Sequence, residues 1–260
     1  LSQLAVGHCP VTRQSLGATD ASIDRVRNDA GYAAGNLAVM SIKANHAKAA
    51  LGFRDALQRV QQLETGSVAG LGLDGLTAEQ WQRVAILCSF VESLPHDEAA
   101  ALPMHVLPPN RLRLFNPAQA LQAFVSRQLL SPGWSHRVAR FEALLPGPAA
   151  RRAFRSFFHT LLPRVLEAGR TPEAHQARWA VEDAWHHPLV QQRWTAFARG
   201  LSAEQCEALV ARATARRLGT AVVERLNHAQ ATDGWALESR GYVPHAVLTA
   251  RHPQQASLPL

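Results

Sequence analysis

The chain has 260 residues, of which 47% are hydrophobic and 18% charged, a balance that is typical of a globular protein and excludes a wholly disordered one. This length suits one large domain or two smaller ones, and the formal net charge of +7 favours a phosphate-bearing partner such as DNA. A GC-rich genome, which favours arginine and alanine, would produce a similar charge, so the charge supports this partner without establishing it.

Signals for a membrane or for secretion are not recognisable. No run reaches the roughly 18 apolar residues of a membrane-spanning helix, and no signal peptide is visible. The three cysteines are far apart, which is typical of a reducing compartment and argues against a zinc knuckle. We therefore expect a cytoplasmic protein. Because the first residue is not methionine, we also expect a processed, trimmed or fragmentary chain that could have lost residues before Leu1.

The first elements are expected near the N-terminus. Residues 22–25 alternate polar and apolar side chains, which predicts a short half-buried strand. Residues 27–31 combine asparagine, aspartate and glycine, which are typical of a turn, and residues 36–40 predict a second short strand. From about Ser41 the spacing becomes helical and continues to about Glu64. The sequence therefore predicts a strand, a loop, a strand and a helix as one supersecondary unit.

This segment resembles the ββα-metal (HNH) endonuclease motif, in the phage and bacterial version S-[IL]-D-R-[IV]-D, GY, GN and N-x-x-K. The stretch from Cys9 to Thr12 also resembles the C-x-[IV]-T-G sequence commonly found ahead of that motif. Together the match covers about a sixth of the chain. The matching residues of the motif are Ser22, Ile23, Asp24, Arg25, Val26, Gly31, Tyr32, Gly35, Asn36, Asn45 and Lys48.

The resemblance implies a nuclease site that holds one divalent cation. Asp24 and Asn45 occupy the metal-binding positions of the family, and both offer oxygen, which suits Mg²⁺ or Mn²⁺, with Zn²⁺ as an alternative. The cation would lie on the scissile phosphate and stabilise charge on the departing oxygen. Asn36 falls where the family's central asparagine ties down the loop.

Two positions depart from the family pattern. Arg25 replaces the histidine that usually activates water, and it could clamp a phosphate but is not an ordinary general base. His46, next to Asn45, is the fallback candidate for the base, although it projects about 100° around the helix from it. Arg27 replaces the second aspartate, with Asp29 close by. The residues expected to contact nucleic acid are Arg25, Arg27, Lys43 and Lys48.

The chain is expected to divide into a small unit and a larger domain. Residues 1–64 would form the HNH-like unit, and residues 65–75, with four glycines, a flexible linker. Residues 76–245 predict an all-helical domain of unknown role, followed by a mobile tail over residues 246–260. The overall fold class is therefore mainly α, with a small ββα-metal unit at the N-terminus.

Local signals divide the helical domain further. Thr77 and Ser202 open capping-box-like sequences, and residues 102–117 form a proline-rich connector that we expect to be extended. Pro163 is expected to kink one helix or end it early. The expected helices beyond the connector cover residues 117–130, 135–145, 149–168, 173–185 and 188–199, with a further one after Ser202.

Few side chains outside the motif suggest chemistry. His8 and Cys9 are adjacent but cannot complete a metal site alone. Another expected helix places carboxylate and imidazole groups at i, i+4, a spacing that can bind a metal. However, this helix ends before Pro188, and the helix dipole favours histidines at a C-terminus without any metal. We prefer that structural interpretation. The side chains on this face are Glu182, Asp183, His186 and His187.

The leading functional hypothesis is a metal-dependent HNH-like endonuclease that hydrolyses phosphodiester bonds of DNA. One alternative is a catalytically degenerate HNH fold that binds nucleic acid or protein without cutting. Another is a helical protein-interaction protein whose N-terminal similarity is vestigial. The sequence leaves open the DNA target, any protein partner and the oligomeric state.

Overall fold

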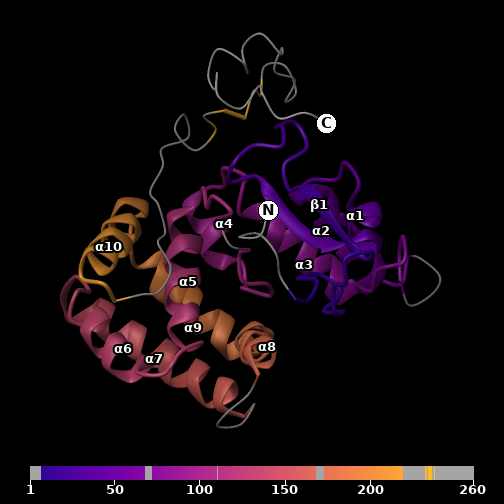
Figure 1. Ribbon diagram of the computed structural model, residues 1–260. Helices are drawn as coiled ribbons and strands as arrows, with labels where there is room; N and C mark the ends of the chain where they lie inside the picture. Colours follow the sequence, from indigo (N-terminus) through magenta and orange to yellow (C-terminus); the bar gives the residue numbers. More distant parts are fainter. Residues whose placement is uncertain are drawn as a thin grey trace.

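The computed structural model describes residues 7–67, 72–109, 111–167 and 173–218, together with Thr232, Gly234, Trp235 and Leu237. Within these residues the protein is mainly helical, with ten helices and one small two-stranded sheet near the N-terminus (Figure 1). None of these helices is both long enough and apolar enough to cross a membrane. The tail expected over residues 246–260 lies outside the described residues.

The sheet consists of β1 (Ala21–Arg25) and β2 (Leu37–Ser41), which pair antiparallel and confirm the two strands expected from the sequence. The register places Asp24 opposite Ala38, and Ala38 is fully buried. Because opposite residues of a pair point to the same face, the Asp24 side chain lies on the buried face of the sheet, and its neighbour Arg25 lies on the other face.

The helical segment after β2 is two helices, α1 (Ile42–Lys48) and α2 (Phe53–Glu64), so the expectation of one helix from Ser41 to Glu64 is wrong. Ala49 adopts a positive φ of 44°, which ends α1. A new N-terminus then forms at Gly52, whose backbone N–H donates to the Asp55 carboxylate at 2.9 Å. A local cap therefore overrides the helical periodicity that continues through this point.

α3 (Ala78–Ser89) begins where the sequence indicated. Thr77 accepts a hydrogen bond from the Gln80 backbone, and the Gln80 side chain accepts one from the Thr77 backbone, which completes a capping box. α3 packs along α2, and its residues from Arg83 to Ser89 are all buried. The glycine-rich stretch 65–75 therefore joins two helices that pack against each other.

The remaining helices form the larger part of the molecule. α5 is buried over most of its length and packs against α4, α6 and α10, whereas α7 packs against α8 and α9. α7 passes through Pro163 and does not end early there. The helices are α4 (His96–Ala101), α5 (Pro117–Gln128), α6 (Trp134–Glu142), α7 (Gly147–Leu166), α8 (Ala174–Ala184), α9 (Pro188–Arg199) and α10 (Ala203–Ala215).

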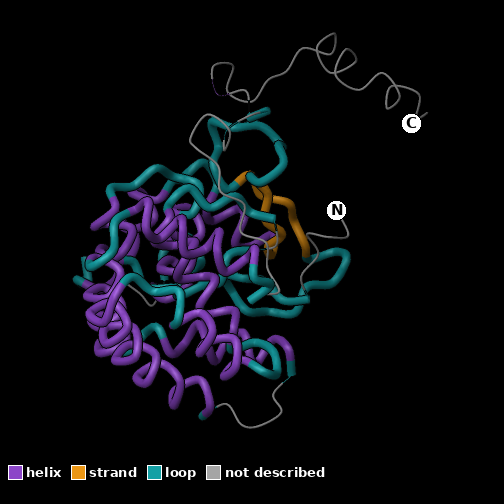
Figure 2. The backbone as a smooth tube through the Cα atoms, turned by 90° about the vertical axis from the view of Figure 1, so that its left-hand side faces the viewer, coloured by secondary structure: helices purple, strands orange, loops and turns teal. Residues whose placement is uncertain are grey.

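Three observations show how the sheet sits relative to the helices. Figure 2 shows both strands at one side of the helical mass. One continuous hydrophobic cluster extends from Cys9 and Val11 through the helices to Trp235. Direct bonds cross the same boundary, because Arg113 donates its backbone N–H to Gly35 at 2.9 Å and Arg83 donates to the Val11 carbonyl at 3.1 Å. The N-terminal elements and the helices thus share a core.

Candidate functional site

Asp24 forms a buried ion pair with Lys48. The Lys48 Nζ lies 3.0 Å from Asp24 Oδ2 and 3.2 Å from Oδ1, and it also donates to the Arg25 carbonyl at 3.1 Å. Oδ1 accepts a hydrogen bond from Lys48 Nζ. Oδ2 lies outside hydrogen-bond geometry, so it attracts the Lys48 ammonium only electrostatically. Burial raises the pKa of Asp24, against the lowering effect of Lys48 and Arg25.

A second contact fastens α1 to β1 beside this pair. The side-chain amide of Asn45 donates to the Ser22 hydroxyl at 2.6 Å. Ser22 and Asp24 are two residues apart on a strand, and Asn45 and Lys48 are three apart on a helix, so each pair faces one direction. A cation at Asp24 would have to displace the Lys48 ammonium, so these side chains, as arranged, do not fit a bound metal.

Asn36 holds the loop between the two strands. Its side-chain oxygen accepts from the Arg27 backbone N–H at 2.9 Å, and its amide nitrogen donates to the carbonyls of Arg27 and Gly31, each at 3.0 Å. The residue is fully buried. Gly35, before it, has a φ of +85°, and a side chain there would collide with Arg113. The loop conformation therefore depends on these two neighbouring residues.

The outer side of the sheet carries an aromatic–guanidinium pair, in which Tyr32 is exposed and Arg25 is half-buried. The Arg25 guanidinium lies 5.1 Å from the centre of the Tyr32 ring, and Tyr32 is 70% exposed. Arg27 forms an ion pair with Asp29 at 2.7 Å. Lys43 and His46 on α1 are exposed. Of the basic residues singled out from the motif, Lys48 alone is buried.

Cys9 accepts hydrogen bonds at its sulfur from two segments. The backbone N–H groups of Thr12 and Ser41 lie 3.4 and 3.2 Å from Sγ. Burial raises the pKa of this thiol, but its hydrogen bonds with Ser41 and Thr12 outweigh the burial, so the pKa is lowered overall. The sulfur thus joins the lead-in to the end of β2, and Cys9 is a free, buried thiol.

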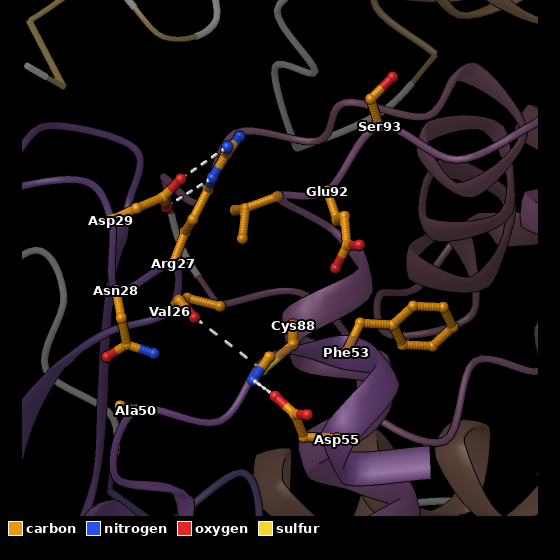
Figure 3. A pocket seen from close by; sticks show the side chains of 12 residues that line it. Val26, Arg27, Asn28, Asp29, Ala50, Phe53, Asp55, Cys88, Glu92 and Ser93 are labelled. Carbon is orange, nitrogen blue, oxygen red and sulfur yellow. Dashed lines mark hydrogen bonds and ion pairs between the residues drawn. The ribbon is translucent and has the colours of Figure 1, made fainter. Parts of the chain in front are cut away.

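A cavity of about 580 Å³ lies between the loop after β1, the start of α2 and the end of α3 (Figure 3). Arg27 and Asp29 line one side, and Glu92 and Phe53 the other. Asp55 adds a third carboxylate, so negative groups outnumber the single guanidinium in its wall. This excess of negative charge disfavours phosphate binding in the cavity.

A second group of charged side chains joins the lead-in, α3 and the end of α8. Glu79, Asp183 and His186 each offer one ligand atom, and these atoms all lie within 4.8 Å of one another. Arg13 forms an ion pair with Asp183 at 2.5 Å, and Arg83 pairs with Glu79. The i, i+4 spacing on α8 indicated two of these residues, but Glu79 comes from a distant helix that sequence spacing could not connect.

Trp235 connects a late part of the chain to the loop between the strands. Its indole N–H donates to the Ala34 carbonyl at 3.1 Å, and its own carbonyl accepts from the Gly31 N–H at 3.0 Å. The ring is fully buried and lies 5.4 Å from that of Phe115. Nothing in the sequence pattern indicated this contact, because its partners are 201 residues apart.

Comparisons with protein-family models, curated proteins and solved structures found no match to this chain. The candidate site residues form three groups: a buried polar network around Asp24, a pair of the half-buried Arg25 with the exposed Tyr32, and a carboxylate–histidine group at α3 and the end of α8.

Proposed function

We propose that this protein binds nucleic acid through a degenerate HNH-like ββα unit and does not cut it. The observation that carries this proposal is the buried ion pair of Asp24 and Lys48 at 3.0 Å. The aspartate at this position in the HNH family holds the catalytic cation, whereas here an ammonium group already neutralises it. Arg25 in place of the family's histidine leaves water without an ordinary base.

Three side chains would contact the ligand, namely the exposed Tyr32 and Lys43 and the half-buried Arg25. An aromatic ring beside a guanidinium offers a surface on which a base can stack, and Tyr32 and Arg25 form such a pair at 5.1 Å. Lys43 would add a phosphate contact from the start of α1. The net charge of +7 would attract a polyanion over a longer range. Lys48 is not included, because it is fully buried.

Binding is tested by fluorescence anisotropy with labelled single- and double-stranded DNA over a range of salt concentrations. Arg25→Gln and Lys43→Gln should each weaken binding and reduce the slope of log affinity against log salt by about 1. Tyr32→Ala should weaken binding of single strands by about 1–3 kcal/mol. Arg212→Gln, on the exposed surface of α10, is the matched control and should leave binding unchanged.

Two results would contradict the binding proposal. One is the absence of salt-dependent binding, which would favour the helical protein-interaction hypothesis instead. The other is an equal loss of affinity in Arg212→Gln and Arg25→Gln, because the ββα surface would then not be the binding site.

Metal-dependent cleavage is the second candidate function. The order of β1, β2 and α1, together with the hydrogen bonds of Asn36 to its loop, favours the activity that the HNH resemblance implies. Plasmid nicking with Mg²⁺, Mn²⁺ or Zn²⁺ separates the candidates, and we expect no more nicking than in EDTA. Nicking that is lost in Asp24→Ala and in EDTA would establish the nuclease, and His46→Ala would then test the fallback base.

A further inference from the structure

The carboxylate–histidine group at the end of α8 has the donor set of a cation site. Its ligand atoms come from Glu79 on α3, Asp183 on α8 and His186 just after α8, all within 4.8 Å of one another. The His186 Nε2 lies 3.9 Å from Glu79 Oε1, is buried and has no hydrogen-bond partner. That distance is too long for a hydrogen bond but suits two donors that share one ion at about 2.0–2.2 Å each.

A second, independent observation is an unpartnered buried imidazole against this group. His105 is 6% exposed, and neither of its ring nitrogens has a hydrogen-bond partner. Its ring stacks on that of His186, with centroids 3.9 Å apart and planes 19° apart. Buried polar atoms in proteins are normally satisfied, so the free, buried Nε2 of His186 indicates that a partner of imidazole nitrogen belongs here, and the stacked His105 ring fixes the plane of that imidazole.

The neighbouring arginines do not exclude a cation. Arg13 holds both Asp183 oxygens, at 2.5 and 3.0 Å, and Arg83 holds Glu79. Each carboxylate oxygen has two lone pairs, so it can accept from a guanidinium and still bind a metal. Hydrogen bonds from outer groups to ligating carboxylates are the usual way in which proteins orient them.

We propose that Glu79, Asp183 and His186 bind one first-row divalent cation such as Zn²⁺, which fastens the end of α8 to α3. Mixed nitrogen and oxygen donors suit Zn²⁺ or Co²⁺, whereas Mg²⁺ prefers oxygen alone and keeps its water. The site does not involve the residues of the proposed nucleic-acid surface, so the two proposals succeed or fail separately.

The test uses the full chain after removal of metal. Co²⁺ should produce a saturable visible absorption at one equivalent, and Zn²⁺ at about a hundredfold above its Kd should raise Tm by about 5 °C or more. Glu79→Gln and His186→Gln should each reduce affinity at least tenfold. The matched controls are Glu167→Gln and His159→Gln, both exposed, which should bind like the unchanged protein.

Three results would overturn the proposal. They are the absence of stoichiometric binding, an affinity that both ligand variants leave unchanged, and an equal rise in Tm with Mg²⁺. If His186→Gln does not fold, Glu79→Gln decides the question alone, because Glu79 is exposed and glutamine retains an acceptor for Arg83.

Discussion

At the scale of single residues, several motif side chains bond to other groups of the same N-terminal unit. Asp24 bonds with Lys48, Ser22 with Asn45, and Asn36 with its own loop. A buried charge without its partner lowers the stability of the fold. These residues are therefore expected to matter as much for stability as for ligand binding. Their spacing in the sequence can therefore be explained by structure alone, and variants have to separate the two roles.

Replacing Lys48 with methionine should lower the free energy of unfolding by about 3–5 kcal/mol, because the Asp24 carboxylate remains buried and uncompensated. The double variant Asp24→Leu with Lys48→Met should recover most of this loss. Chemical denaturation measures both, and Lys43→Met, at an exposed position, should change stability by less than about 0.5 kcal/mol. Equal losses in the single and double variants would contradict the ion-pair explanation.

The three thiols should react in a defined order. Burial raises the pKa of Cys88 and of Cys206 to about 12, so both remain protonated at pH 8. The pKa of Cys9 is lowered, so Cys9 should be alkylated first when the native protein opens locally. Mass spectrometry after iodoacetamide treatment measures the order, with denatured protein as the control. Faster modification of Cys88 than of Cys9 would contradict this prediction.

At the scale of elements, caps decide where helices begin, and periodicity alone does not. Periodicity continues from α1 into α2, yet Ala49 and the Gly52 cap divide them. Conversely, the capping boxes at Thr77 and Ser202 were visible in the sequence and were confirmed. The cap at Gly52 is also local, but glycine has no side-chain oxygen and is a weaker N-cap signal in a sequence than threonine or serine.

Ser202 offers a direct test of such a cap. Its hydroxyl accepts from the Gln205 backbone N–H at 3.2 Å at the start of α10. Ser202→Ala should lower the free energy of unfolding by about 1 kcal/mol, and Ser202→Gly by only a few tenths, because glycine leaves the N-terminus open to water. Urea unfolding midpoints measure the difference. A larger loss with glycine than with alanine would show that the hydroxyl is not the main contribution.

At the scale of the whole molecule, contacts between distant segments join the N-terminal elements to the helices. Arg13 bonds to Asp183 across 170 residues, and Trp235 closes the loop between β1 and β2. The shared hydrophobic cluster predicts that unfolding of the two parts is coupled.

Trp235→Ala tests this coupling. We expect a loss of about 3–5 kcal/mol of stability, because a fully buried indole is removed. The Gly31 amide should also exchange its hydrogen faster, since it donates to the Trp235 carbonyl and the altered segment no longer packs there. Hydrogen exchange over residues 27–36 measures the effect, with Trp134→Ala as the control. Unchanged exchange in Trp235→Ala would contradict the contact.

The sequence predicted the two strands and most of the helices. It could not show that Lys48 is the partner of Asp24 and is buried, because a lysine in an exposed-looking helix has no local signal for burial. It could not connect Glu79 or His105 with His186 either, since these residues are far apart in the sequence and only the tertiary fold brings them together.

The bonds of Trp235 have a consequence for synthesis of the chain. Ala34 is synthesised 201 residues before its partner. At about 5–20 residues per second, the loop between the strands waits about 10–40 s for that partner. During this interval the hairpin at the beginning of the nascent chain is held by Asn36 without its indole neighbour. A chaperone would therefore encounter this hairpin without its Trp235 contact. A premature stop codon before Trp235 would alter the part of the protein that was made first.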